Sequence, residues 1–167
     1  MIGCDDRSTL ERAQPYLDAM GSRSIHCGAA GAGSVVKLCN NLALAAQMVG
    51  ICEALNLGEK LGVDPIILSS VMNSSTAKCW SSEVNNPHPA VAASMENRPP
   101  ASNNYVGGFA TNLMWKDLKL ALQAAEEENI VLPLTSTTKD LYHLAQIYGL
   151  GDRDFGVLLA FLQGKAK

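Results

Sequence analysis

A lysine and an asparagine lie one helical turn apart just after a glycine-rich segment, and they are the strongest candidates for chemistry in the sequence. The segment reads GAAGAGSVVKLCNN from Gly28 to Asn41. Lys37 and Asn41 fall on one face of a helix, because residues four apart are neighbours there. A lysine amine that is buried near the positive end of a helix is a candidate for proton exchange with a substrate hydroxyl. A surface lysine that extends into water is the alternative.

The segment differs from two glycine-rich motifs that hold phosphates. A Walker loop places its lysine directly after the last glycine, whereas Lys37 follows Gly33 by four residues. A dinucleotide-binding turn needs GxGxxG, but residue 36 is a valine and the third glycine is missing. Neither phosphate-binding motif is therefore present in this segment.

The element that positions this lysine is a long helix. From Ser34 to about Leu61 the sequence is rich in Ala and Leu and has no proline, which predicts one helix of roughly 28 residues. Gly62 ends it. Between Leu42 and Leu57 the helix is apolar almost all round, so we expect other elements to cover it on most sides.

Further helices surround this element in the prediction, with at most two short strands. We expect a strand at Met1–Gly3, a helix from the first acids through Met20, and a strand over residues 24–28. Helices are also predicted to begin at Pro65, Thr111 and Pro133, with a last short one after Gly151. The side chains expected to be buried are Ile66, Ile67, Val71 and Met72 in the first of these, and Leu113, Leu118, Ala121, Leu122 and Ala125 in the second.

Residues 76–104 break this regularity with several prolines, serines and asparagines. A long irregular loop inside a compact domain is more often functional than idle. We therefore expect it to contribute to a binding site.

Composition excludes several classes of partner. The 167 residues are 47% apolar and 17% charged, which is typical of a folded protein. A net charge of -3 leaves no basic surface to attract nucleic acid or anionic membranes. The five cysteines show no CxxC pair and the three histidines no ligand spacing, so we expect no metal site and free thiols in a reducing compartment. Cys39 and Cys52 are expected to act as small apolar side chains of the long helix.

The glycine-lysine segment resembles the catalytic stretch of the β-hydroxyacid dehydrogenase family, whose pattern is GxxGxGxxxKxxxN. Three further stretches resemble the branch that oxidises 3-hydroxyisobutyrate in valine breakdown: EALNLGEKLGVDP, KCWSSEVNNPHP and NNYVGGFATNLMWKDLKLA. The resemblance runs from Met1 to about Leu162. Every fixed position of the catalytic pattern is filled, by Gly28, Gly31, Gly33, Lys37 and Asn41.

This resemblance implies a mainly α fold, like the C-terminal helical domain of 6-phosphogluconate dehydrogenase, built around one long central helix. It implies that residues 1–29 are a short α/β remnant of an NAD-binding Rossmann domain, with its last strand, helix and strand. Residues 30–167 would then form an all-helical domain for substrate binding and dimerisation. The expected assembly is a homodimer or homotetramer.

The resemblance also assigns roles to individual residues. Lys37 would be the general acid/base that exchanges the proton of the substrate hydroxyl, and Asn41 would act beside it. Asn40 and Asn41 would bind the substrate. Lys116 and Phe109 would contact the cofactor, NAD.

From the residues alone, two of these side chains have simpler interpretations. Lys116 would be a solvated neighbour of Asp117, and Phe109 an anchor in the apolar core. In the irregular loop, the resemblance implies that Trp80, Ser81 and Ser82 help to close the substrate pocket and pack a partner subunit. Filling of the core by Trp80 is an equally open interpretation.

The implied activity is NAD-dependent oxidation of 3-hydroxyisobutyrate, a small hydroxy acid, to methylmalonate semialdehyde. The 167 residues contain neither GxGxxG nor a Ser-Gly-Gly motif for the substrate carboxylate. We therefore expect the chain alone to reduce little or no NAD. The alternatives are a related enzyme that acts on tartronate or succinic semialdehyde, and a non-catalytic helical dimerisation module. The resemblance implies the mitochondrial matrix, or the cytoplasm of a bacterium, and no targeting peptide is expected in these residues.

Overall fold

The computed structural model describes residues 1–165, and most of them are helical. Contacts divide the chain into two compact units, Met1–Asn41 and Leu42–Lys167. The long helix α2 (Ala32–Lys60) contributes residues to both units. The domain boundary expected between residues 29 and 30 stays a prediction.

The first unit confirms the expected short α/β segment. Strand β1 (Ile2–Gly3) pairs in parallel with β2 (His26–Gly28), and α1 (Arg7–Met20) connects the two strands. The predicted long helix begins two residues earlier than expected, at Ala32.

The start of α1 is held by the side chain of Asp6. Its carboxylate accepts hydrogen bonds from the backbone N–H groups of Ser8 (3.1 Å) and Thr9 (3.0 Å) and from both hydroxyls. The hydroxyl of Thr9 is the largest of the causes that lower the pKa of Asp6 from 3.8 to about 2. This N-cap satisfies donors that the first turn of a helix leaves without partners.

Acidification is expected to unwind the start of α1. Because the pKa of Asp6 is lowered in the folded chain, its stabilising effect is present above 3.8 and is lost as the pH falls through about 2. We expect the NMR chemical shifts of residues 7–10 to lose their helical values over that interval. An Asp6→Ala variant should already have a weaker first turn at neutral pH, with no matching acid transition. An identical transition in that variant would contradict the assignment.

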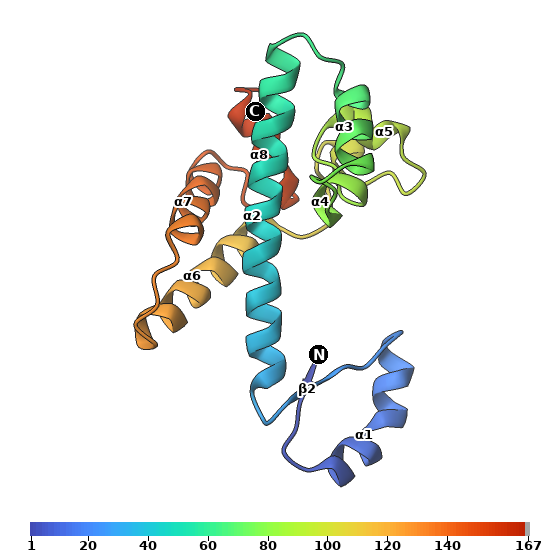
Figure 1. The fold of residues 1–167 in the computed structure, drawn as a ribbon, viewed down its shortest axis with the longest axis vertical. Coiled ribbons are helices and arrows are strands. Elements are labelled where there is room, and N and C mark those ends of the chain that lie inside the picture. Colours follow the sequence, from blue (N-terminus) through green and yellow to red (C-terminus); the bar gives the residue numbers. More distant parts are fainter. Residues whose placement is uncertain (166–167) are drawn as a thin grey trace. The chain divides into compact units, whose positions relative to one another are not determined.

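The second unit packs its helices around the later part of α2. Figure 1 shows the pair α6 and α7 on one side of this part of α2, and α3, α4 and α5 on the other. The elements of the unit after α2 are α3 (Pro65–Ser74), α4 (Trp80–Glu83), α5 (Pro89–Ser94), η1 (Pro100–Asn103), α6 (Thr111–Glu127), α7 (Pro133–Ile147), η2 (Phe155–Val157) and α8 (Leu158–Leu162).

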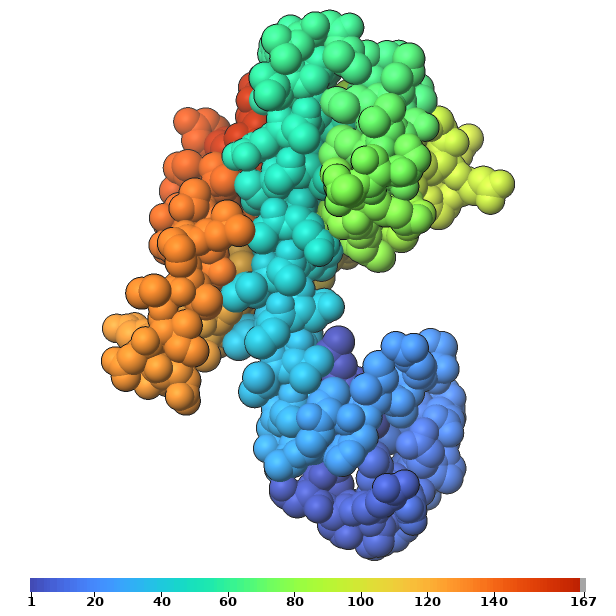
Figure 2. Space-filling view, viewed as in Figure 1, coloured from blue at the N-terminus to red at the C-terminus, as the bar shows by residue number. Residues whose placement is uncertain are grey.

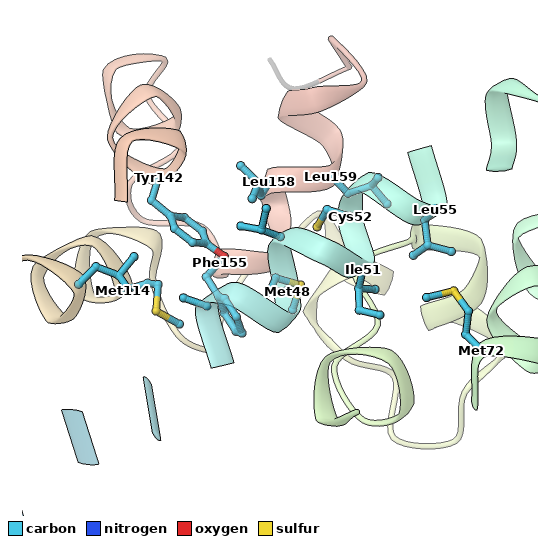
Figure 3. Close-up of a cluster of buried hydrophobic side chains, with 13 residues drawn as sticks. Met48, Ile51, Cys52, Leu55, Met72, Met114, Tyr142, Phe155, Leu158 and Leu159 are labelled. Atoms are coloured by element: carbon cyan, nitrogen blue, oxygen red, sulfur yellow. The ribbon is translucent and has the colours of Figure 1, made fainter. Parts of the chain in front are cut away.

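One face of α2 forms the centre of the core. Ala45, Met48, Cys52 and Leu55 have no exposed surface. They follow helical spacing, so they lie along one face of α2. Side chains from five further elements join this face in one core cluster, as Figure 3 shows: Met72 of α3, Met114 of α6, Tyr142 of α7, Phe155 of η2, and Leu158 and Leu159 of α8.

The expectation that α2 is covered on most sides is wrong for the opposite face. Gly50, Glu53, Ala54 and Leu57 are exposed, and Leu57 keeps 62% of its surface. Figure 2 shows that part of α2 is uncovered between the bulk of α6–α7 and that of α3–α5. Apolar composition by itself does not distinguish a covered face from an uncovered one.

By length and composition alone, α2 also passes the test for a helix that could cross a membrane. The core helix of a soluble protein passes the same test, and the buried residues of α2 contact protein.

Two of the predicted buried faces are partly wrong. In α3, Ile66, Ile67 and Val71 are exposed, whereas Met72 is buried and Leu68 packs partly against the core. Apolar residues occupy so much of the circumference of α3 that periodicity could not select the buried side. In α6, Leu113 is 46% exposed and the adjacent Met114 is buried instead; the rest of the buried apolar face comprises Leu118, Ala121 and Ala125.

The five cysteines are free. Cys52 is buried in the core, and burial raises its pKa. Cys39 is exposed, so the expectation that it acts as a small apolar side chain of the helix is wrong for this residue. It lies before the part of α2 whose face forms the core.

The irregular loop is more ordered than expected, because it contains α4, α5 and η1 and buries several polar side chains. The amide of Asn86 donates to the hydroxyl of Ser69 and to the carbonyl of Ser82, both at 2.9 Å. Trp80 is 48% exposed, which excludes the interpretation that it fills the core. The neighbouring Ser81 and Ser82 are buried.

A pair of leucines on α2 tests the location of the core. Leu55→Ala should lower the free energy of unfolding by about 2–5 kcal/mol, because a fully buried side chain is removed and a cavity remains. The matched control Leu57→Ala should change it by less than about 1 kcal/mol, because that side chain is mostly exposed. Denaturant unfolding measures both, and equal losses would contradict the assignment of the two faces.

Candidate active site

The candidate lysine follows a turn whose shape depends on glycine. Gly31 has a φ of 91°, a conformation that residues with a Cβ rarely adopt. Its carbonyl accepts hydrogen bonds from the N–H groups of Ser34 (2.9 Å) and Val35 (3.2 Å), and these bonds start α2. A Cβ on Gly33 would lie 2.9 Å from the carbonyl oxygen of Met1. The absence of a side chain at Gly33 therefore lets the first turn of α2 pack directly against β1.

This turn borders a pocket of about 470 Å³ on the first unit, and Lys37 is one of its lining residues. The other lining residues are Met1, Gly3, Gly31, Gly33 and Ser34. Of the two interpretations that the sequence left open, the structure agrees with the surface lysine that extends into water, because Lys37 is exposed. Its long side chain lies one turn into the helix, so a small ligand in the pocket can contact both the amine and the backbone of the glycine turn.

The two candidate asparagines lie on the next turn of α2 and contact each other. The amide of Asn40 donates to Oδ1 of Asn41 at 3.2 Å. Asn41 keeps 9% of its surface, whereas Asn40 is exposed. The first unit thus places Lys37, Asn40 and Asn41 on consecutive turns of one helix.

Lys116 lies in the first half of α6 in the second unit. Its Nζ lies 2.8 Å from Oδ1 of Asp117, and its side chain is 52% exposed. Asp117 itself is buried, with 5% of its surface exposed. The ion pair with Asp117 agrees with the simpler interpretation of Lys116, and the half-exposed amine also fits contact with an anionic group of a cofactor.

Phe109 is half-buried in the turn before α6, and its backbone is fixed on both sides. Its N–H donates to Oδ2 of Asp154 at 3.0 Å, and its carbonyl accepts from the N–H of Phe155 at 2.8 Å. Its ring meets that of Phe155 edge-on, with the centroids 6.0 Å apart. Phe109 packs against the core, as the residues alone suggested, and the residue stays partly exposed.

Asp154 is a residue that sequence reasoning missed. It is 2% exposed, and burial raises its pKa although the N–H groups of Gly156 and Phe109 and the amide of Asn85 donate to it. The sequence does carry a signal, since this acid directly precedes the apolar run FGVLLAFL. A carboxylate beside a buried segment needs hydrogen-bond donors, and one of the donors to Asp154 is the N–H of Phe109.

The candidate residues fall into two groups. Lys37, Asn40 and Asn41 belong to the first unit, and Phe109 and Lys116 to the second. Each group is defined by its own local geometry, and their joint action on one substrate and cofactor stays a prediction.

Comparison with known proteins identifies the family. Residues 31–162 match the family model described as NAD-binding of NADP-dependent 3-hydroxyisobutyrate dehydrogenase. The match covers the glycine turn from Gly31, the lysine helix and nearly all of the second unit. The chain belongs to this family.

Individual members agree with this assignment. The chain is 41% identical over its whole length to the probable mitochondrial 3-hydroxyisobutyrate dehydrogenase of Dictyostelium discoideum, and covers 50% of it. It is 42% identical over 90% of its length to the mitochondrial enzyme of Homo sapiens, and covers 44% of it. The structure of Mycobacterium tuberculosis 3-hydroxyisobutyrate dehydrogenase with L-serine matches 98% of the chain with a TM-score of 0.89 and 41% identity, over 54% of that chain. The chain thus spans about half the length of the relatives it matches.

Two glycines of α2 test whether the first turn must lack a side chain. Gly33→Ala should destabilise the first unit, because its methyl group would meet the backbone of Met1 and Gly3. We expect faster hydrogen exchange at the amides of Ile2 and Cys4, which bond to the second strand region. Gly50→Ala is the control, because its methyl group would meet nothing within 4 Å, and it should stabilise the helix by about 0.5–1 kcal/mol. Unchanged exchange in Gly33→Ala would refute the packing argument.

Proposed function

We propose that this chain carries the substrate side of an NAD-dependent β-hydroxyacid dehydrogenase, with 3-hydroxyisobutyrate as the substrate and methylmalonate semialdehyde as the product. The observation that carries the proposal is the pocket at the glycine turn. Lys37 is one of the residues that line it. Membership of the family and the L-serine in the Mycobacterium tuberculosis structure support it, because L-serine is itself a 3-hydroxy acid.

In the proposed reaction, Lys37 transfers the proton of the substrate hydroxyl. The neutral amine accepts that proton as the carbon–oxygen double bond forms, and in the reverse direction the ammonium returns it. NAD supplies the acceptor for the hydride that leaves the carbinol carbon. Asn41, with its Oδ1 already engaged by Asn40, holds the substrate close to the amine.

The cofactor contacts in the proposal are Phe109 and Lys116. A half-buried aromatic ring offers a flat apolar surface to the nicotinamide, and a half-exposed cation offers a partner to its phosphates. The description of the matching family, which names NAD binding, supports placing cofactor contacts within residues 31–162. We propose the mitochondrial matrix as the location, since the relatives from Dictyostelium discoideum and Homo sapiens are named mitochondrial.

The second candidate function is a non-catalytic dimerisation module. The observation in its favour is a set of exposed apolar side chains on α2 and α3, namely Leu57 (62% exposed), Ile67 (62%) and Val71 (57%). Exposed apolar surface of this kind is typical of contacts between subunits. Homodimers and homotetramers are compatible with both candidates, so catalysis is the discriminating measurement.

A chimaera tests the catalytic proposal directly. The part of the Mycobacterium tuberculosis relative that precedes its matching region would be joined to Met1 of this chain. We expect the chimaera to reduce NAD when 3-hydroxyisobutyrate is added. Lys37→Ala should lower kcat by roughly 10²- to 10⁴-fold, because proton transfer in the transition state is lost. Lys37→Arg should be equally impaired, since a guanidinium does not release its proton.

Two results decide between the candidate functions. Lys60→Ala is the matched control, because Lys60 is an exposed lysine on the same helix, and its variant should keep the parent rate. A chimaera that folds and binds NAD but turns over equally with and without the Lys37 amine would exclude the proposed role of this lysine. A folded, dimeric chimaera without any turnover would favour the dimerisation module.

A further inference from the structure

The Asp154 carboxylate lies at the base of the turn that carries Phe109. Oδ2 accepts the N–H of Phe109 at 3.0 Å, while Oδ1 accepts the N–H of Gly156 at 2.9 Å and the side-chain amide of Asn85 at 3.2 Å. Of these bonds, the one from Phe109 spans 45 residues of sequence. A single buried acid therefore connects the C-terminal segment to the turn before α6.

The approach between the two segments is close. Gly108 has a φ of 68°, and a Cβ at this position would overlap Oδ2 of Asp154. The main chain of Asp154 is held as well, because its N–H donates to the carbonyl of Tyr105 at 2.8 Å. Asp154 is thus fixed by its own backbone and in turn fixes the N–H of Phe109.

Because Asp154 is buried, its carboxylate depends on these hydrogen bonds. A buried charge without partners is costly, whereas this carboxylate accepts three hydrogen bonds. An uncharged amide of the same shape offers one acceptor atom in place of two. An amide oxygen at the place of Oδ1 still accepts from Gly156 and Asn85, and this leaves an N–H₂ group opposite the N–H of Phe109.

We propose that Asp154 is a positioning residue for the cofactor: its carboxylate fixes the backbone of Phe109 and thereby the place where the Phe109 ring meets the nicotinamide ring. The inference rests on the proposed function, since it needs Phe109 to contact NAD. Asp154 itself touches neither substrate nor cofactor in this arrangement and acts through Phe109.

The hydrogen bond to Phe109 is measured first, by NMR on the whole chain without ligand. Asp154→Asn should speed hydrogen exchange at the Phe109 amide by roughly 10- to 100-fold, the factor that corresponds to losing a hydrogen bond to a charged group. The matched control is Asp152→Asn, two residues away and exposed, which should leave that amide unchanged. Unchanged exchange in folded Asp154→Asn would overturn the proposal.

A double substitution separates this geometry from a general loss of stability. Adding Asn85→Asp to Asp154→Asn places an acceptor where a donor was, so the new amide at position 154 turns its N–H₂ towards residue 85 and its oxygen towards Phe109. We expect slow exchange at the Phe109 amide to return, while the Gly156 amide now loses its acceptor and exchanges faster. Exchange at the Phe109 amide that stays as fast in the double variant as in Asp154→Asn would count against the proposal.

The wild-type chain provides a test that does not depend on any variant folding. The amide-proton signals of Phe109 and Gly156 should shift together as the Asp154 carboxyl titrates. This titration should occur at a higher pH than for an ordinary aspartate, because burial raises the pKa of Asp154. The neighbouring titratable groups are Cys52, Tyr105 and Tyr142, and burial raises the pKa of each, so they stay neutral in the acidic range. Phe109 and Gly156 signals that do not move together would overturn the proposal.

Titration with NAD then tests the cofactor part. The titration uses the chimaera described above. We expect NAD to shift the ring signals of Phe109 in the chimaera and in its Asp152→Asn variant, and to shift them several-fold less in its Asp154→Asn variant. Equal shifts in the unsubstituted chimaera and in its Asp154→Asn variant would overturn the positioning role and leave the proposed function intact. Ring signals that do not respond in an unsubstituted chimaera that binds NAD would overturn the proposed contact of Phe109 and, with it, the positioning role.

Discussion

Burial of one face of α2 is the interaction on which the second unit depends. Ala45, Met48, Cys52 and Leu55 are fully buried, and side chains from five further elements join them in one core cluster. At about 25 cal/mol for each Å² of apolar surface removed from water, a face of this length outweighs any single hydrogen bond in the chain. The same helix begins at the glycine turn, so the element that organises the core also carries the candidate lysine.

A glycine and a buried carboxylate fix the backbone near the two sets of candidate residues. In the first unit, Gly33 lets backbone meet backbone, which fixes the start of the helix that bears Lys37. In the second unit, the buried carboxylate of Asp154 fixes the turn that bears Phe109. Both devices act on the main chain, so in the proposed function the catalytic side chain and the cofactor contact are each positioned by a residue with no chemistry of its own.

Many helix starts were predictable, because capping residues and prolines act within one segment and do not depend on contacts with distant segments. Asp6 and Asp64 cap helices where the sequence places an acid before the first turn, and Pro65 and Pro133 begin helices as expected. The buried faces of α3 and α6 were less predictable. Where apolar side chains occupy most of a helix, as at Ile66 and Ile67, periodicity cannot show which side meets a neighbour. The partnership of Asp154 with Phe109 joins residues 45 positions apart and leaves no local pattern.

The sequence by itself determined the longer helices, the glycine turn and the family pattern around Lys37, because these depend on backbone propensities and on residue spacing within one element. Tertiary structure alone decided that Leu57 stays exposed while Leu55 is buried, that Trp80 lies outside the core, and that Asp154 holds Phe109. These outcomes depend on which distant segments meet. Contacts of that kind are set by packing and by the pairing of buried polar groups. The periodicity of a single helix predicts neither of these.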